Sequence, residues 1–146
     1  GSAGSGCWAP AGLDVLGAID ARLFVLDPIP NSNNLPVAEI TKRALAGVRK
    51  LRSVSKAPIL LVENHPQPDS IFRADIANHY RRASQALHKA YKQLQAEGVK
   101  GLYYMYGSEI KLKEDDMIEG THPNDTGCRA YAEAYKRKIR TILTKK

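Results

Sequence analysis

Apolar and polar positions divide the chain into two kinds of segment. Three short segments each contain an unbroken apolar run, at residues 21–27 (ARLFVLD), 57–64 (APILLVEN) and 101–107 (GLYYMYG). Around them, apolar residues recur at steps of three and four, which places their side chains on one face of an α-helix. The pattern predicts the order helix, strand, helix, strand, helix, strand, helix.

Each predicted helix has a start or a stop signal beside its apolar face. Pro10 and Pro36 suit the starts of the first two helices, Gly98 suits the end of the third, and Asn124 or Asp125 can cap the last. The apolar positions of the four helices are, in order, Leu13, Leu16 and Ile19; Val37, Ile40, Ala44, Val48 and Leu51; Phe72, Ile76, Tyr80, Ala83, Leu87, Ala90 and Leu94; and Cys128, Tyr131, Tyr135, Ile139 and Ile142.

The apolar strands indicate how these elements assemble. Strands that are apolar at every position are typical of a parallel sheet with helices on both faces. We therefore expect an α/β fold, a three-layer αβα sandwich with a parallel sheet, formed by a single domain over residues 1–146. A chain of this length is sufficient to bury a hydrophobic core.

Three predicted loops lie at the carboxyl ends of the strands, where ligands of such sheets bind. They are DPIPNSNN, ENHPQPDS and GSEIKLKEDDMIEGTHP. Asn31 lies in the first loop and His122 in the third, so both are expected to face the same crevice. In the middle loop, Asp69 or Ser70 is expected to cap the following helix.

The net charge of +7 raises the question of an anionic partner. The basic residues are spread over the predicted helices and gather near the end of the last one, where cations complement the helix dipole. No aromatic-interleaved basic stripe accompanies them, so nucleic acid is not expected as a partner. No apolar run approaches the roughly 20 residues that span a bilayer, so no membrane partner is expected. The sequence indicates no cellular compartment.

Two cysteines, Cys7 and Cys128, lie far apart and lack the spacing of a metal site. Cys128 shares the apolar face of the last predicted helix, so its thiol is predicted to be buried. A disulfide between the two cysteines stays open as an alternative.

The segment EGTHP, residues 119–123, contains the strongest candidate chemistry. An acid three residues before a histidine, with a glycine between them, can fold back onto the imidazole in a tight turn. Such a carboxylate fixes the tautomer of the ring and stabilises the imidazolium, which leaves the other nitrogen free as a general base. Pro123 restricts the backbone at His122 and keeps it out of the following helix. The alternative is a surface His-Pro turn that does no more than precede a helix.

Several segments, in order along the chain, resemble the SGNH (GDSL-type) esterase family. The stretch VKGLYYMYGSEIKLKEDDMIEGTHPNDTGCRAYAEAYKRKI is similar to the end of that family, in which a strand, a loop and an Asp-x-x-His-Pro turn precede the final helix. ARLFVLDPIPN resembles the segment that carries the family's oxyanion-hole asparagine, here Asn31. APILLVEN resembles the next core strand. The opening GSAGSG, otherwise readable as a linker, resembles the family's Gly-x-Ser-Gly-x-Gly turn, whose glycine amide, here that of Gly4, is the other oxyanion donor.

This resemblance implies a flavodoxin-like SGNH hydrolase fold with ester hydrolysis through an acyl-enzyme. His122 is then the base, Glu119 its orienting acid, and Gly4 and Asn31 the oxyanion donors. The implied substrate is a small-molecule or carbohydrate ester, and no metal or organic cofactor is implied.

Two departures from the family pattern bear on this expectation. Glu119 stands where the family has aspartate, and Asp116 is a possible substitute for it. The family's first block, a strand and a Gly-Asp-Ser turn with the nucleophile, is absent. Ser2 and Ser5 lie in the oxyanion turn and are not nominated as nucleophiles. The resemblance therefore implies that two strands precede Gly1 and that an upstream segment or a partner chain completes the sheet and supplies the serine.

Two other classes of function remain. One is a catalytically inactive or truncated SGNH-like fold that acts as a binding module. The other is a small nucleotide-binding α/β domain, which is disfavoured because the glycines of GSAGSG follow no predicted strand.

The remaining histidines and the tyrosines of the third strand receive structural interpretations. His79 and His88 are predicted to be solvated on the polar side of the long helix. His65 is expected to make a loop hydrogen bond, with substrate contact as the alternative. Tyr103, Tyr104 and Tyr106 are expected to pack on the sheet rather than to form a sugar-stacking platform.

Overall fold

The computed structural model describes residues 7–65, 72–120 and 122–144, and it confirms the predicted order of helices and strands. Its elements are α1 (Pro10–Gly17), β1 (Phe24–Leu26), α2 (Ile29–Ser32), α3 (Val37–Val54), β2 (Ile59–Val62), α4 (Ala74–Ala96), β3 (Leu102–Met105), the 3₁₀ helices η2 (Gly107–Ile110) and η3 (Glu114–Asp116), and α5 (Asp125–Thr144).

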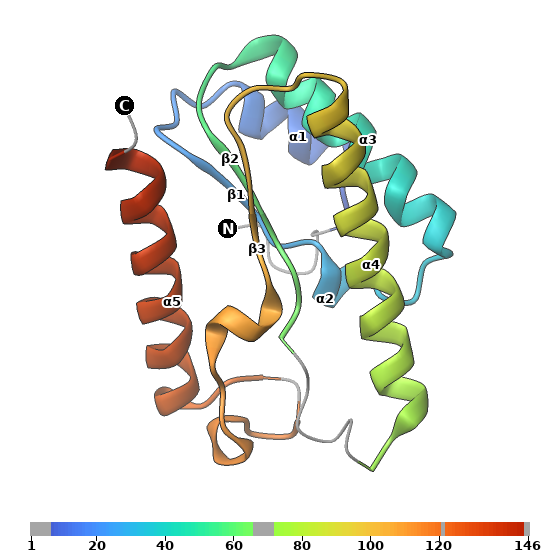
Figure 1. Cartoon of the computed structure of the whole chain (residues 1–146), viewed down its shortest axis with the longest axis vertical. Helices are drawn as coiled ribbons and strands as arrows, with labels where there is room; N and C mark the ends of the chain where they lie inside the picture. The colour runs from blue at the N-terminus through green and yellow to red at the C-terminus, as the bar shows by residue number, and fades with distance from the viewer. Residues whose placement is uncertain (1–6, 66–71, 121, 145–146) are drawn as a thin grey trace.

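The three strands form a parallel sheet in the order β1-β2-β3 (Figure 1). Ile59 of β2 is in register with Phe24 on one side and with Leu102 on the other. Every residue of β2 is buried. This central strand confirms that continuous apolar sequence indicates a strand covered on both faces.

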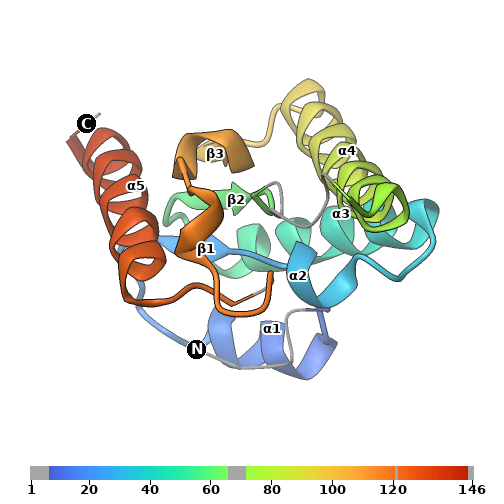
Figure 2. The same cartoon turned by 90° about the horizontal axis from the view of Figure 1, so that it is seen from below.

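Helices cover the two faces of the sheet in separate layers, as expected for an αβα sandwich (Figure 2). Ile59 and Leu61 lie in one hydrophobic cluster, with residues of α3 and α4, and α1 packs against α3. Leu60 and Val62 point to the other face, into a cluster with residues of α5. The alternation of side chains along β2 therefore divides the core in two.

The β1 strand is less well covered than its neighbours. Phe24 and Leu26 are buried on the α3 and α4 side, whereas Val25, on the opposite side, is 38% exposed. The cluster beneath α5 includes residues of β2 and β3 but not Val25. Among the described strands, β1 forms one edge of the sheet and has this uncovered position.

The long helix α4 begins later than predicted. It starts at Ala74 with Arg73 at the N-cap, so Phe72 lies outside it and is 88% exposed. The expected caps, Asp69 and Ser70, lie outside the described residues. A helix that starts at Ala74 leaves the apolar Phe72 without a packing surface in the described part of the chain.

Three smaller predictions at the helix ends were wrong. The first loop contains the single helical turn α2, and Ile19 lies beyond the end of α1 with 51% of its surface exposed. Cys128 is exposed rather than buried, because Gly127 is the buried residue in the first turn of α5.

Both cysteines are free thiols, so the open alternative of a disulfide is not realised. No helix in the described ranges is long and apolar enough to cross a membrane.

Candidate active site

The carboxyl ends of all three strands point to one end of the molecule, the lower end in Figure 1. β1 leads there into α2, which contains Asn31, and β2 leads into Glu63, Asn64 and His65. β3 leads into the two 3₁₀ helices and then into the segment 117–124 before α5. The loops with Asn31 and His122 therefore share one end of the sheet, as a parallel arrangement requires.

The segment that carries His122 forms a closed turn. Met117 and Pro123 form an antiparallel bridge, and the amide of Ile118 donates to the carbonyl of His122 at 2.8 Å. Inside this turn, Nδ1 of His122 is hydrogen-bonded to Oε1 of Glu119. The predicted pairing of acid and imidazole is therefore present in the structure.

Both members of this pair are open to solvent. The side chains of His122 and Glu119 are 75% and 51% exposed. The hydrogen bond to His122 lowers the pKa of the Glu119 carboxyl below its usual value. Glu119 is therefore ionised at neutral pH and occupies Nδ1, whereas Nε2 of the ring has no hydrogen-bond partner in the described part of the chain.

Asp116, the alternative acid, has a different position. It is buried, and its Oδ2 accepts a hydrogen bond from the amide of Lys113 at 2.9 Å. The carbonyl of Asp116 accepts the amide of Asn124 at 3.0 Å. Asp116 thus organises the loop, whereas Glu119 is the acid that contacts His122.

The start of α5 holds this loop closely. Asn124 caps the helix, because its Oδ1 accepts the amide of Gly127 at 3.0 Å, while its side-chain amide donates to Asp115. A Cβ at position 127 would lie 2.8 Å from Cβ of Pro123 and closer still to the Asp116 carbonyl. Only glycine at this position permits the loop to pack directly on the helix.

Of the two predicted oxyanion donors, Gly4 and Asn31, only Asn31 belongs to the described residues. Gly4 lies outside the described residues. Asn31 lies in α2 with an exposed side chain, and its carbonyl accepts a hydrogen bond from the Cys7 thiol at 2.8 Å. The single turn of α2 thus directly follows β1 and carries Asn31 at the same end of the sheet as His122.

Asp27 is a titratable residue at this end that sequence analysis did not single out. It follows β1 directly, and the hydroxyl of Tyr135 donates to its Oδ2 at 3.2 Å. Desolvation by the surrounding protein raises the pKa of Asp27 to about 6, although part of the side chain reaches solvent. An acid directly after an apolar strand was the available signal, since this position falls at the ligand-binding end of a parallel sheet.

Replacing Asp27 with asparagine is expected to stabilise the protein at alkaline pH but not at acidic pH. The pKa is raised from 3.8, so the folded state holds this proton more tightly than the unfolded state. That contribution to stability is complete below pH 4 and is lost as the pH rises through 6. After allowance for partial solvent exposure, we expect the melting temperature of Asp27→Asn to exceed the parent by about 3 °C at pH 8, with no difference at pH 4.

Thermal unfolding followed by circular dichroism at the two pH values measures this effect. Asp20→Asn changes an exposed acid outside the site and is the matched control. An equal shift for Asp27→Asn at both pH values would contradict the interpretation.

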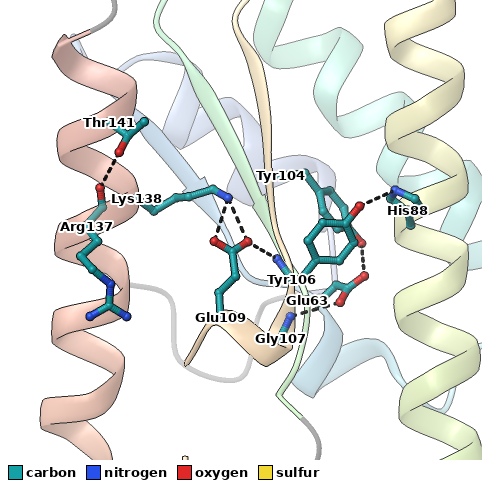
Figure 3. A network of polar contacts seen from close by, with 9 residues as sticks. All are labelled: Glu63, His88, Tyr104, Tyr106, Gly107, Glu109, Arg137, Lys138 and Thr141. Carbon is teal, nitrogen blue, oxygen red and sulfur yellow. Dashed lines mark hydrogen bonds and ion pairs between the residues drawn. The ribbon is translucent and has the colours of Figure 1, made fainter. Parts of the chain in front are cut away.

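A cavity of about 420 Å³ lies at the same end of the sheet, between the loops after β2 and β3 and the helix α4. Its lining includes Glu63, His65, Arg81 and His88. Oε1 of Glu63 accepts the Tyr104 hydroxyl at 2.7 Å and Oε2 accepts the Gly107 amide at 3.1 Å (Figure 3). These contacts fix one carboxylate in the wall of the cavity.

The other three histidines differ in how far their side chains are exposed. His65 is only 2% exposed and meets the ring of Tyr131 edge-on, with centroids 5.9 Å apart. His88 is not solvated as predicted, because the rings of Tyr91, Tyr104 and Tyr106 surround it and its Nε2 lies 3.3 Å from the Tyr106 hydroxyl (Figure 3). His79 is exposed, which confirms the prediction for that residue. Within the described ranges, no three His, Cys, Asp or Glu side chains gather as metal ligands.

A family model described as the GDSL-like lipase/acylhydrolase family matches residues 1–140. The chain belongs to this family. No curated protein sequence matches it.

Two solved structures share the fold of this chain, and the first of them is also named as GDSL-like. A Bacteroides ovatus protein named as a candidate GDSL-like lipase has a TM-score of 0.87 and 29% sequence identity, and the match covers 96% of this chain and 41% of that one. Salicylyl-acyltransferase SsfX3 from a tetracycline biosynthetic pathway has a TM-score of 0.78 at 18% identity, and the match covers 96% of this chain and 43% of that one. The GDSL-like chain therefore spans less than half the length of either protein.

Proposed function

We propose that the protein is a serine esterase that hydrolyses acyl esters through an acyl-enzyme, with His122 as its general base. The observation that carries this proposal is the pairing of His122 with Glu119 in an exposed turn at the carboxyl end of the sheet. A histidine with one ring nitrogen bound to a carboxylate and the other accessible has the arrangement that activates a hydroxyl nucleophile. The family match supports the reaction class.

In the proposed reaction, Nε2 of His122 accepts the proton of a serine hydroxyl as the serine oxygen attacks the ester carbonyl. The side-chain amide of Asn31 and the backbone amide of Gly4 donate to the oxyanion that forms. The carbon–oxygen bond to the alcohol then breaks, and His122 returns the proton to the leaving alcohol. Water attacks the acyl-serine with the same base, which releases the acid and the free serine.

We assign the serine to a segment upstream of Gly1, or to a partner chain, that joins the sheet. The edge position of β1 among the described strands supports this assignment, since an edge strand can pair with a further strand. The matched structures are more than twice as long as this chain, which is consistent with such a segment.

The proposed substrate is a small ester, including esters of acylated carbohydrates. The cavity beside Glu63 and Arg81 lies at the end of the sheet where His122 lies and offers polar groups for the part of the substrate away from the ester. A pocket with a few fixed polar groups selects ligands by orientation.

Replacing Glu119 with glutamine is expected to lower kcat by about tenfold or more, because an amide does not stabilise the imidazolium that forms during the reaction. Glu119→Asp retains the charge and is expected to keep most of the activity. Asp116→Asn is the matched acid-to-amide control. It should change the thermal stability of the loop rather than kcat, since Asp116 contacts the Lys113 amide and not His122.

Steady-state kinetics on an aryl acetate measure these variants in a form of the protein that includes the upstream segment. If Glu119→Gln left kcat unchanged while Asp116→Asn lowered it, the orienting acid would be Asp116 instead.

An inactive binding module is the alternative. A serine-directed fluorophosphonate distinguishes the two functions. Stoichiometric labelling of the longer protein, dependent on His122, supports the esterase. Absence of labelling in a folded protein that contains the upstream segment supports the binding module.

A further inference from the structure

A second cleft, of about 530 Å³, lies on the outer edge of the sheet away from β1. Its walls come from β3, from Tyr91 of α4, from the second half of α5 and from the loop after β3. Tyr103 and Tyr104 contribute from the middle of β3, before the loop that leads to His122. This cleft and the cavity beside Glu63 share no lining residue, although the Tyr104 hydroxyl donates to Glu63.

Charge in the cleft is unbalanced. Glu109 is the carboxylate in its lining, and Lys138 binds both of its oxygens, at 2.9 and 3.0 Å (Figure 3). Oε1 of Glu109 also accepts the amide of Tyr106 at 2.8 Å. Arg137 and Lys111 line the cleft as well, and neither has a carboxylate partner among the described residues. Three cations and one carboxylate leave an excess of two positive charges.

The backbone at Lys111 supports a role for this cation. Lys111 follows the 3₁₀ helix η2 and has a left-handed conformation, with φ of 56°. Residues other than glycine, asparagine and aspartate seldom adopt this conformation, because their Cβ crowds the backbone. A lysine therefore lines the cleft in a backbone conformation that glycine or asparagine would adopt at lower cost.

Aromatic rings form part of the remaining lining. Tyr91 and Tyr103 are half-buried there, whereas Tyr104, whose ring lies 4.9 Å from that of Tyr91, is only 6% exposed. The part of α5 that lines the cleft extends from Ala134 to Ile142, about 12 Å along the helix. The cleft is thus elongated, with two half-buried tyrosines and two cations that have no carboxylate partner among the described residues.

We propose that this cleft binds an acidic oligosaccharide, with carboxylates on Arg137 and Lys111 and sugar rings against the half-buried Tyr91 and Tyr103. A guanidinium binds a carboxylate with two parallel hydrogen bonds, and a flat aromatic ring packs against the apolar face of a sugar. Two unpaired cations match a short acidic saccharide better than nucleic acid, which requires a longer basic stripe along its phosphates. The proposal is independent of the esterase activity, since it concerns binding at another edge of the sheet.

Fluorescence anisotropy with labelled hexagalacturonate tests the proposal in the intact protein. We expect binding at 50 mM salt that weakens several-fold at 500 mM, and none with labelled maltohexaose, its neutral counterpart. Arg137→Gln should weaken binding about tenfold. Arg140→Gln removes the same charge one turn along α5, outside the cleft lining, and should have little effect.

Lys111→Asn provides a second variant that keeps the fold, because asparagine accepts the left-handed conformation. It should leave the melting temperature unchanged or higher and weaken binding about fivefold. Equal losses in Arg137→Gln and Arg140→Gln would show attraction to net charge alone and overturn the proposal. So would equal affinity for a single-stranded DNA hexamer, or absence of hexagalacturonate binding at low salt.

Discussion

Replacing His122 with alanine is expected to lower kcat by at least about 10²–10⁴-fold on an aryl acetate, in a form of the protein that includes the upstream segment. General-base catalysis alone contributes this range, and loss of one member of a nucleophile–base unit can cost more. The side chain of His122 is largely exposed, so its removal should leave the fold intact. Steady-state kinetics with a thermal unfolding measurement on the same sample separate loss of chemistry from loss of structure.

His79→Ala is the matched control for this result. His79 is an exposed histidine on α4, and its truncation should leave kcat unchanged. If His122→Ala turned over the ester at nearly the rate of the parent, His122 would not be the base, and the pairing with Glu119 would be a surface contact only.

Asn31→Ala is expected to lower kcat by about 10²–10³-fold, with a smaller change in KM. A side-chain donor in an oxyanion hole acts mainly on the charge that develops in the transition state, so its loss affects the chemical step more than substrate binding. Asn31 is exposed in α2, directly after β1, at the end of the sheet where His122 lies.

Asn34→Ala is the control for this second variant, because Asn34 is an exposed asparagine of the same loop that lies beyond α2. It should have nearly parental kinetics. A change in KM alone for Asn31→Ala would identify Asn31 as a substrate contact and not as an oxyanion donor.

The sequence was sufficient to predict the sheet and the acid–imidazole pair, for reasons that are local. Each residue from Ile59 to Val62 is apolar, and a strand with no polar face must be covered on both sides. Glu119 and His122 are three residues apart around Gly120, so a single turn brings their side chains together. In both cases the decisive neighbours lie close in the sequence.

The features that were missed depend on contacts between distant segments. The sequence placed His88 on a polar helix face, but the rings of Tyr104 in β3 and Tyr106 directly after it pack around His88. The pKa of Asp27 rises because surrounding protein desolvates the carboxyl, and this effect outweighs the hydrogen bond from distant Tyr135, which lowers the pKa. Helical periodicity places residues on a face but does not show which residues of other elements cover that face.

The positions of the two cysteines affect how inhibition of this protein should be interpreted. The Cys128 sulfur lies in the first turn of α5, near the carbonyl of Pro123. Pro123 directly follows His122 in the sequence. The Cys7 thiol donates to the carbonyl of Asn31. Alkylation of either thiol would therefore place a bulky group beside a residue of the proposed active site. Inactivation by maleimides or iodoacetamide would then reflect obstruction of a serine mechanism and would not identify a cysteine nucleophile. The variant Cys128→Ser should remain active and should no longer be alkylated at position 128.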